Sequence, residues 1–535
     1  MHFWFSLTAA APPLLLLACG LVPSRWADRH LAVMRRASVG LALLAFALSV
    51  TAGVLLAIAG PLDSTFVQWS RPIPLSLGVY VDSLSAIMLV LISFIGLIVV
   101  RFSIRYLDGD ARQGRFLRWM SFTIGAALLL VVARNLVLFT LAWTLTSLGL
   151  HRLLKHYPER SWALWAARKK FLISRLGDLL LLAALVLTFQ CFGTFEYGEI
   201  FAAAQAIHAG SSAGSPLIPL IGVLFVLGAM TKSAQFPFHS WLPDTMETPT
   251  PVSALMHAGI INAGGFLVIR LSPLIALSHA ALDFLALTGA FTALFGGLVM
   301  LTQTSIKRSL AYSTIAQMGF MMLQCGLGAF SAALLHIVAH SAYKAHAFLT
   351  CGSVLESAAR LRNGSFPTQR GIWRLAMLPL AIAIAVGLYA FTFQLLGIDV
   401  AAKSGGPVLG LVMTIALTQL VWTGLSAGTW GLAARGLFSA TLVCGAYAGS
   451  YLLIDSLFAG SKSHILVPAS SLDMPVIVLV AAGFTGIFAL QSVTASFARA
   501  AWLRALYVHA MNGFYIDIPA RRITARFWRQ SAPVQ

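Results

Sequence analysis

Residues 231–244 read TKSAQFPFHSWLPD and place Lys232 at the end of a long apolar segment, just before two prolines. A lysine at mid-membrane depth costs roughly 2.5–3.5 kcal/mol on insertion scales and is normally retained where it faces a wet cavity or an ion path. Pro237 and Pro243 remove backbone donors, so neighbouring helices or water must satisfy the carbonyls that they free. The stretch predicts an interrupted membrane helix that carries a charge, which makes transport the first hypothesis. A helix-end lysine that snorkels to the interface is the alternative.

The composition of the whole chain is that of a membrane protein. Of its 535 residues, 59% are hydrophobic and 10% are charged, and the mean hydropathy is +0.85. A spanning helix needs about 20 apolar residues, and about fifteen such segments follow one another with short connections. They lie near 4–22, 37–60, 79–101, 117–133, 135–150, 171–192, 217–234, 249–275, 280–303, 308–328, 331–357, 375–398, 406–430, 436–457 and 474–495. We therefore expect an all-α polytopic membrane protein with about 15 transmembrane helices.

The net charge of +19 does not indicate a nucleic-acid partner, because the basic residues are not clustered on a soluble face. They follow alternate spans, including Lys169 and Lys170 after the fifth and Lys307 and Arg308 after the ninth. By the positive-inside rule, the N-terminus lies outside and the C-terminus in the cytoplasm. The first span has no basic residues before it and is expected to be a retained helix rather than a signal peptide. The basic, aromatic tail from Phe497 is expected to contact a partner or to lie on anionic lipid.

Nothing in the sequence indicates an enzyme or a bound cofactor. The five cysteines are scattered through the apolar spans without C-x-x-C spacing or a Cys/His cluster, which favours a role as small buried hydrophobes. No glycine-rich phosphate loop follows a strand. We expect no metal site on this chain, and energy for transport must come from an ion gradient or a partner.

Histidines and a further lysine lie inside two of the predicted spans. His257 is a polar residue of the eighth span, and the eleventh span carries three titratable residues at intervals of four, namely His336, His340 and Lys344. That spacing puts them on one helical face. Histidine titrates near neutrality and can accept and donate a proton, so we predict a proton path through these groups. Zinc binding is disfavoured because no carboxylate or further ligand lies nearby in sequence. Packing and interhelical hydrogen bonding remain alternatives.

Three other charged residues lie in or beside predicted spans. Arg175 and Asp178 are three positions apart in the sixth span, which allows an ion pair on one face. Structural and transport roles are both open for this pair. Asp82 lies near the start of the third span and is expected to cap or anchor that helix.

Taken together, these segments resemble the antiporter-like membrane subunits shared by respiratory complex I (NuoL-type), Mrp cation antiporters and the DabB subunit of the DAB inorganic carbon pump. The resemblance runs from about Val81 to Glu356 and includes VDSLSAIM, ARNLVLFTLAW, ISRLGD, TKSAQFPFHSWLPD, TPVSALMHAG, TSIKRSLAYSTIAQMGFMM and HIVAHSAYKAHAFL. It implies two inverted repeats of five helices, each with one interrupted helix. The implied division is N-terminal helices at 1–116, repeats at 117–275 and 280–430, C-terminal helices at 431–496 and an amphipathic basic cytoplasmic tail at 497–535.

The resemblance also implies roles for individual residues. Lys232 matches the central lysine of the seventh helix and His257 the connecting histidine of the eighth. The relay of the eleventh helix is matched by His336, His340 and Lys344.

Two positions depart from the family pattern. Thr144 stands where the respiratory subunits have a glutamate, so the charge partner of the lysine is missing. Asp178, on the neighbouring helix, is our candidate replacement. The twelfth helix lacks the family pattern Phe-Ser-Lys-Asp-Glu. Lys403 is the candidate replacement for the lysine of that pattern.

The DabB group is favoured by residues 511–517, which read MNGFYID, by the eighth-helix version HAGIINAGGFLVIR, and by the expected lack of a long lateral helix. In that family the membrane subunit passes cations down their gradient and is coupled to DabA, a cytoplasmic zinc protein similar to β-carbonic anhydrases, which converts CO2 to bicarbonate. The resemblance therefore implies an H+- or Na+-conducting subunit in the bacterial inner membrane, with zinc and hydration chemistry on the partner.

The predicted path enters from outside and runs through Lys344, His340, His336, His257 and Lys232. A proton-translocating NuoL-type subunit or a Mrp-type antiporter subunit is the alternative function. A non-conducting scaffold is disfavoured, because it gains nothing from costly buried ionisable groups.

Overall fold

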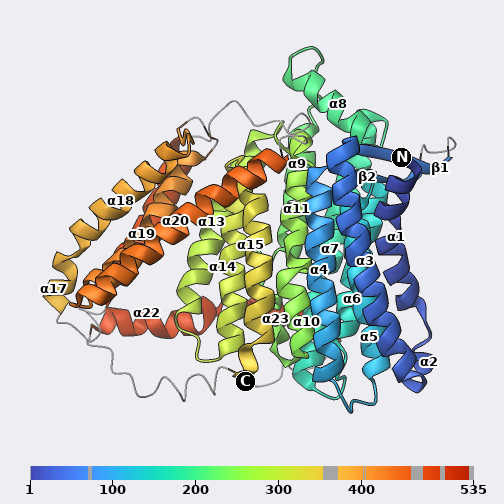
Figure 1. Cartoon of the computed structure of the whole chain (residues 1–535), viewed down its shortest axis with the longest axis horizontal. Coiled ribbons are helices and arrows are strands. Elements are labelled where there is room, and N and C mark those ends of the chain that lie inside the picture. Colours follow the sequence, from blue (N-terminus) through green and yellow to red (C-terminus); the bar gives the residue numbers. More distant parts are fainter. Residues whose placement is uncertain are drawn as a thin grey trace.

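The structure is a computed structural model of the chain and describes residues 2–69, 75–353, 371–401, 403, 405–458, 474–494 and 500–528. Long helices stand side by side, and a two-stranded antiparallel sheet lies at the end of the molecule that carries the N-terminus (Figure 1). In the described part of the chain, twelve helices are long and apolar enough to cross a membrane. The chain is therefore an α-helical polytopic membrane protein.

The first group of elements shares one continuous buried core with the helices that follow it (blue at α1 to green at α8 in Figure 1). Its elements are α1 (His2–Leu21), α2 (Ser24–Arg29), α3 (Leu31–Ala59), β1 (Leu62–Trp69), β2 (Leu75–Val81), α4 (Ser83–Tyr106), α5 (Gln113–Val132), α6 (Leu136–Leu154), α7 (Ser161–Phe192) and α8 (Tyr197–His208). Asp82 caps α4 as predicted, because its carboxylate accepts a hydrogen bond from the Ser85 backbone N–H at 2.9 Å.

The second group contains the interrupted helices. Its elements are α9 (Ile218–Lys232), the 3-10 turns η1 (Phe238–Trp241) and η2 (Pro243–Glu247), α10 (Thr250–Ala258), the 3-10 turn η3 (Ile260–Asn262), α11 (Ala263–Arg270), α12 (Ser272–Ile275), α13 (His279–Met300), α14 (Ile306–Gly326), α15 (Phe330–Leu349) and η4 (Cys351–Ser353). The predicted break after Lys232 is confirmed. The predicted span 249–275 is itself broken at Gly259, between α10 and α11.

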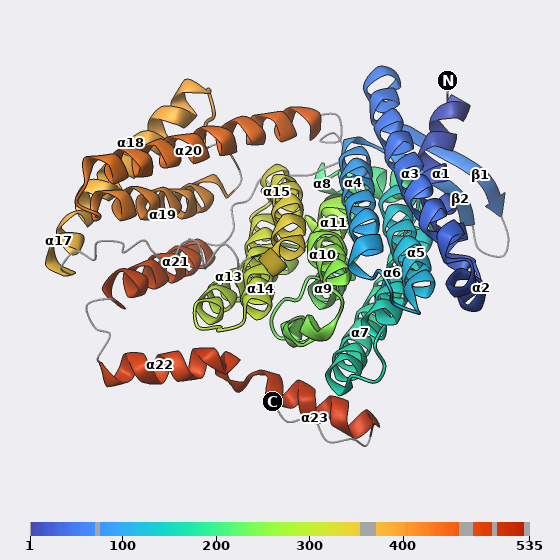
Figure 2. The same cartoon turned by 60° about the horizontal axis from the view of Figure 1, so that its bottom comes forward.

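The third group is more loosely packed. It comprises α17 (Gly371–Ala376), α18 (Leu378–Leu395), α19 (Gly406–Leu425), α20 (Trp430–Phe458), α21 (Met474–Thr494), α22 (Ala501–Met511), η6 (Gly513–Tyr515) and α23 (Asp517–Trp528). Helices α18, α19 and α20 form a small core of their own. Helices α22 and α23 run across the end opposite the sheet, as both views show (Figures 1 and 2).

The predicted spans agree with the helices, with differences in detail. All fifteen predicted segments coincide with helices, but α9 is too short, and α14 and α15 are not apolar enough, to count among the twelve. The β1–β2 hairpin was missed, so the expectation of an all-α chain is wrong at that point. Helix α7 begins ten residues before the predicted start at 171, because Lys169 and Lys170 find buried hydrogen-bond partners and need not lie in a loop. Glu356 and Phe497, which bound the predicted resemblance and tail, lie outside the described residues.

Candidate functional site

Lys232 lies at the C-terminus of α9, where the chain leaves the helix through Ser233 and Ala234. Ala234 has a φ of 49°, a left-handed conformation that ends the helix. The Lys232 side chain points inward: Nζ donates to the Trp143 carbonyl at 2.8 Å and to Thr146 Oγ1 at 2.5 Å, and lies 3.9 Å from the Trp143 ring centre. The snorkelling alternative is therefore wrong, since the residue is 7% exposed and is bonded to α6.

Asp178 lies on α7 beside Thr144 of α6 and within electrostatic range of Lys232. Its carboxylate pairs with Arg175 at 2.7 Å, which confirms the predicted ion pair. A buried carboxylate thus stands next to the position where the respiratory subunits carry their glutamate. The replacement of that glutamate by Asp178 stays a prediction.

Lys170 also belongs to this cluster, and sequence reasoning missed it. We predicted a loop position that sets the topology, but Lys170 is buried in α7 and donates to the Ser147 carbonyl at 3.0 Å. It lies within electrostatic range of Lys232 and Asp178. One feature of the sequence could have predicted this position. Lys170 and Asp178 are eight positions apart, a spacing that puts both on one face of a helix.

Its neighbour Lys169 was likewise expected in a loop, and it too is buried. Lys169 Nζ donates to the Ser240 carbonyl at 2.9 Å and to Asp244 at 3.0 Å, and it pairs with Asp517 of α23. These contacts dock α23 against α7 and η2.

His257 lies at the second helix break and is completely buried. Its Nδ1 is 3.0 Å from Thr314 Oγ1, its ring stacks on Phe348 at 4.3 Å, and within the described ranges Nε2 has no hydrogen-bond partner. Across the break, the Asn262 side chain donates to Ser341 Oγ of α15 at 2.8 Å. The break therefore places polar groups of α10 and η3 against α14 and α15.

A small cavity with a mostly apolar lining lies beside Thr146 and this break. Its volume is about 20 Å³, and its lining includes Thr146, Gly259 and Ala263. That volume is enough for one water molecule. Because Thr146 also accepts the hydrogen bond of Lys232, the cavity connects the surroundings of Lys232 with the α10–α11 break.

The predicted face of α15 is confirmed. The rings of His336 and His340 stack with centres 6.0 Å apart, and neither nitrogen of His340 has a hydrogen-bond partner among the residues that the structure describes. Lys344 is completely buried and donates to Ser313 Oγ at 2.7 Å and to the Leu310 carbonyl at 3.2 Å. His257 and Lys344 both lie within electrostatic range of His340.

The six predicted residues therefore form two clusters. Lys232 and Asp178 lie between α6, α7 and α9, whereas His257 joins the three residues of α15. Helix α15 runs away from the end that carries the sheet, since α4 starts at the sheet and α4, α5, α6, α7, α9, the broken α10–α11 segment, α13, α14 and α15 alternate in direction. His336 is thus nearest the predicted outer side, and the predicted order along α15, from Lys344 to His336, is reversed.

Lys403 lies outside both clusters. It is exposed and pairs with Asp455 of α20 at 3.5 Å, so it does not stand in for a buried lysine. In the part of the chain that the structure describes, no group of three or more His, Cys, Asp or Glu side chains could hold a metal ion.

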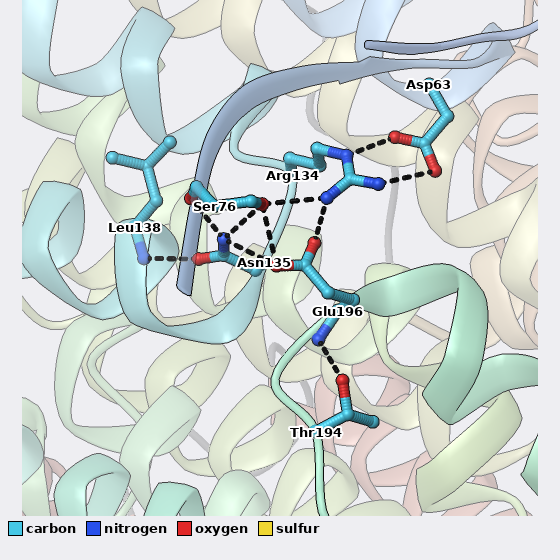
Figure 3. Close-up of polar contacts among 7 residues, drawn as sticks. All are labelled: Asp63, Ser76, Arg134, Asn135, Leu138, Thr194 and Glu196. Carbon is cyan, nitrogen blue, oxygen red and sulfur yellow. Dashed lines mark hydrogen bonds and ion pairs between the residues drawn. The ribbon is translucent and has the colours of Figure 1, made fainter. Parts of the chain in front are cut away.

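A polar cluster ties the loops together at the sheet end of the molecule (Figure 3). Arg134 pairs with Asp63 of β1 and Glu196 before α8, and donates to Ser76 Oγ of β2 at 2.7 Å. Asn135 donates to the Ser76 carbonyl at 2.7 Å and caps α6. The cluster holds the hairpin, the α5–α6 connection and the α7–α8 connection in place.

A buried ion pair lies near the same end of the molecule. Arg270, at the end of α11, donates to both carboxylate oxygens of Asp82 at 2.6 and 2.9 Å. The two residues are 188 positions apart in the chain, so no spacing pattern could have revealed the pair. It fixes α11 against the start of α4.

Comparisons with known proteins agree with this geometry. Residues 133–398 match the family described as NADH:quinone oxidoreductase/Mrp antiporter, TM, and residues 67–117 match that described as NADH-ubiquinone oxidoreductase (complex I), chain 5 N-terminus. Among solved structures, the Mrp complex from a Dietzia species superposes with a TM-score of 0.59 and 25% sequence identity. That match covers 99% of this chain and 57% of the other.

Curated relatives include two carbon transporter subunits. The chain is 38% identical over 530 residues to the probable inorganic carbon transporter subunit DabB2 of Halothiobacillus neapolitanus, which covers 98% of this chain and 94% of that protein. It is 34% identical over 465 residues to the probable DabB of Hydrogenovibrio crunogenus, with 85% and 84% covered. Chain 5 of the Synechocystis NAD(P)H-quinone oxidoreductase is 38% identical over 292 residues, 54% of this chain and 43% of that one.

Proposed function

Because the chain belongs to the DabB family of probable inorganic carbon transporter subunits, with an antiporter-like membrane domain, we propose that it is the cation-conducting subunit of an energy-coupled carbon pump. The cation is H+ or Na+. Its flux down the gradient drives conversion of CO2 to bicarbonate by a DabA-like zinc protein, similar to β-carbonic anhydrases, docked on the cytoplasmic side of the inner membrane. Catalysis takes place on that partner.

The observation that carries this proposal is the pair of buried ionisable clusters beside the two helix breaks. Burying such groups at membrane depth is costly, and they are normally retained where an ion moves. Between the Lys232 cluster and the α10–α11 break lies a cavity large enough for one water molecule, in which Thr146 supplies the polar side chain. Water there would connect the Thr146 hydroxyl with the Gly259 carbonyl, which accepts one hydrogen bond from Asn262 and can accept a second, and so would join the clusters into one path.

The path begins on the predicted outer side at His336 and continues along α15 to His340 and Lys344. Stacked histidine rings with unpartnered nitrogens can accept and donate protons in turn. His257, which lies beside Phe348 and Thr314, passes the charge to the cavity and then to Lys232. Asp178 attracts the charged form of Lys232. It takes the place of the glutamate that the respiratory subunits have at the position of Thr144.

The proposal also includes two internal repeats. Residues 117–275 and 280–430 form two inverted five-helix repeats, which begin at α5 and α13. The alternation of helix directions and the helix break after α9 support this division.

Lys232→Ala tests the central role of that lysine. We expect inorganic-carbon uptake to fall at least tenfold in cells that lack carbonic anhydrase and express the chain with a DabA-like partner. Lys403→Ala is the matched control, since Lys403 is exposed and outside both clusters. Equal membrane levels of the two variants exclude a folding defect. Normal uptake by Lys232→Ala would overturn the proposal.

A second candidate function is proton or sodium translocation in a respiratory or antiporter complex. The match of residues 133–398 and the likeness to the Mrp complex favour it. Uptake that needs both the chain and the DabA-like protein and collapses with an uncoupler supports the carbon pump. Cation exchange in vesicles without carbon uptake supports the second candidate.

A further inference from the structure

A wide basic cavity lies away from both ion clusters, between α2, the start of α5 and the end of α6. Its volume is about 570 Å³. Five cationic side chains line it, namely Arg112, Arg115, Arg118, Arg152 and Lys155. The cavity lies at the end of the molecule opposite the β1–β2 sheet, where Figure 1 shows α2 and the loops of α5 and α6. By the positive-inside rule, this is the cytoplasmic side.

The positive charge of this basic cavity is only partly neutralised. Arg112 pairs with Glu159 at 3.3 Å, and Arg115 lies 3.7 Å from Asp28. Ion pairs at such partly exposed positions contribute little stability. Two carboxylates therefore face five cations.

The other three cations have no carboxylate within ion-pair distance in the described part of the chain. Arg118 donates to neutral acceptors, the Gly20 carbonyl at 2.8 and 3.0 Å and Ser24 Oγ at 2.5 Å. Arg118 and Arg152 lie over the Trp119 ring at 4.7 and 5.6 Å from its centre. The tryptophan thus holds two guanidinium groups near each other despite their repulsion. An anion bound between the two guanidinium groups would attract both of them and so offset their mutual repulsion.

Apolar side chains continue from the basic cavity toward the middle of the membrane. Leu148 lies one helical turn before Arg152 on α6 and is 40% exposed, and Leu141, two turns further along the same face, is 52% exposed. Leu21, at the end of α1 beside Ser24, is 71% exposed. Trp119 stands where the basic and apolar parts meet, as tryptophan does at membrane interfaces. The surface therefore matches a molecule with an anionic head and a hydrocarbon tail.

We propose that the basic cavity binds the phosphate headgroup of an anionic phospholipid, with an acyl chain along Leu148 and Leu141. Guanidinium groups bind phosphate oxygens through paired hydrogen bonds, and Lys155 adds a point charge. Basic pockets on the cytoplasmic side of membrane helices suit such headgroups. The site is independent of the proposed transport function.

The double variant Arg152→Gln with Lys155→Gln tests this site, because neither side chain forms an ion pair within the described residues, so both can be neutralised with little effect on folding. The full-length protein is purified in detergent and titrated with cardiolipin, phosphatidylglycerol or phosphatidylethanolamine, and bound lipid is counted by native mass spectrometry. We expect the affinity for cardiolipin and phosphatidylglycerol to fall at least tenfold, while binding of phosphatidylethanolamine stays weak and unchanged. Arg105→Gln is the control, since Arg105 lies at the same end of the molecule but outside the cavity.

Two outcomes would overturn the proposal. One is wild-type affinity for anionic lipid in the double variant when its thermal unfolding is unchanged. The other is displacement of the lipid by millimolar inorganic phosphate, which would identify a site for a free anion. If the double variant unfolds early, Lys155→Gln alone provides the same comparison, with a smaller expected loss of about threefold.

Discussion

Lys232 and Lys344 are held in the same way, although they belong to different clusters. Each amine donates to a main-chain carbonyl and to the hydroxyl three residues later on a neighbouring helix, Trp143 and Thr146 in one case, Leu310 and Ser313 in the other. A hydroxyl accepts from an ammonium group and donates to a neutral amine. Each hydroxyl can therefore stay hydrogen-bonded to the amine whether the lysine is charged or neutral.

Asp178→Asn tests whether this carboxylate replaces the glutamate missing at Thr144. Without the negative charge beside Lys232, the charged lysine loses its attraction, and we expect ion flux and carbon uptake to fall about tenfold or more. The measurement is cation flux in proteoliposomes. Asp108→Asn is the control, since it removes only an exposed carboxylate that pairs with Arg35. Equal flux in the two variants would dismiss Asp178 as the replacement.

The loops beside the basic cavity contain a pH-sensitive contact. His156 Nε2 and the Tyr157 hydroxyl lie 3.2 and 3.1 Å from Asp110 Oδ2. Burial acts to raise the pKa of Asp110, but hydrogen bonds from the Arg112 backbone, His156 and Tyr157 outweigh it and lower that pKa below 3.8. Burial lowers the pKa of His156 below 6.5, although Asp110 opposes this.

Both shifts mean that the unfolded loops bind more protons than the folded ones as the pH falls. The stability that His156 contributes is present above pH 6.5 and is lost on acidification, and that of Asp110 is lost at lower pH still. We expect residues 107–113 and 155–157 to lose hydrogen-exchange protection at pH 5 relative to pH 7.5, after correction for intrinsic rates. His156→Gln should flatten this dependence. Greater protection at pH 5 than at pH 7.5 would contradict the predicted direction of this pH dependence.

At the scale of the element, α13 and α14 show how small residues let helices approach in a membrane. A Cβ on Gly296 would lie 2.7 Å from the Ala316 backbone nitrogen, and one on Gly319 would lie 2.4 Å from that of Ala293. Gly297, the next residue on α13, has nothing within 4 Å of such an atom. Glycine at such contacts allows helix backbones to pack closely in lipid.

Gly296→Ala and Gly297→Ala form a matched pair. We expect Gly296→Ala to destabilise the protein by about 1–3 kcal/mol, because the methyl group forces α13 and α14 apart. Gly297→Ala should be neutral or stabilise by up to about 1 kcal/mol through helix propensity. Thermal unfolding in detergent, followed by tryptophan fluorescence, measures both. Equal effects would show that the packing at Gly296 is not tight.

At the scale of the whole molecule, hydropathy and residue spacing predicted most of the helices and the common face of His336, His340 and Lys344. Both depend on local periodicity, which the sequence displays directly. The partners of Lys232 on α6 and the pairing of Arg270 with Asp82 depend on contacts between distant segments, so no local pattern contains them. The β1–β2 hairpin was not predicted, because its strands lie in the short connection between two long apolar spans that dominate the hydropathy pattern.

Charged residues near helix ends were the other source of error. Lys169 and Lys170 were assigned to a loop, because a basic run beside an apolar span usually sets topology. In the structure they lie inside α7, where the Ser240 and Ser147 carbonyls, with Asp244, satisfy their amines. The sequence shows the charge of such a residue but not the acceptors that neighbouring helices bring to it.

The sidedness of the molecule decides which face a soluble partner and anionic lipids meet, and it can be measured directly. Ser212, between α8 and α9, and Ser305, between α13 and α14, are exposed at opposite ends. Ser305 lies beside α22 and α23, in a cavity of about 410 Å³ that Asp517 and Arg521 also line. Single cysteines at the two positions report on the two sides once Cys191 and Cys351, which are only partly buried, are replaced by alanine.

In intact spheroplasts we expect a membrane-impermeant maleimide to label Ser212→Cys but not Ser305→Cys, and to label both after permeabilisation. The reason is the positive-inside rule, since the basic loops share the end of the molecule that carries Ser305. The reverse pattern would place the His336 end of α15 in the cytoplasm and reverse the proposed direction of ion entry. It would also move the basic cavity to the outer leaflet and move the docking face of a DabA-like partner to the sheet end, so one labelling experiment tests every proposal that depends on orientation.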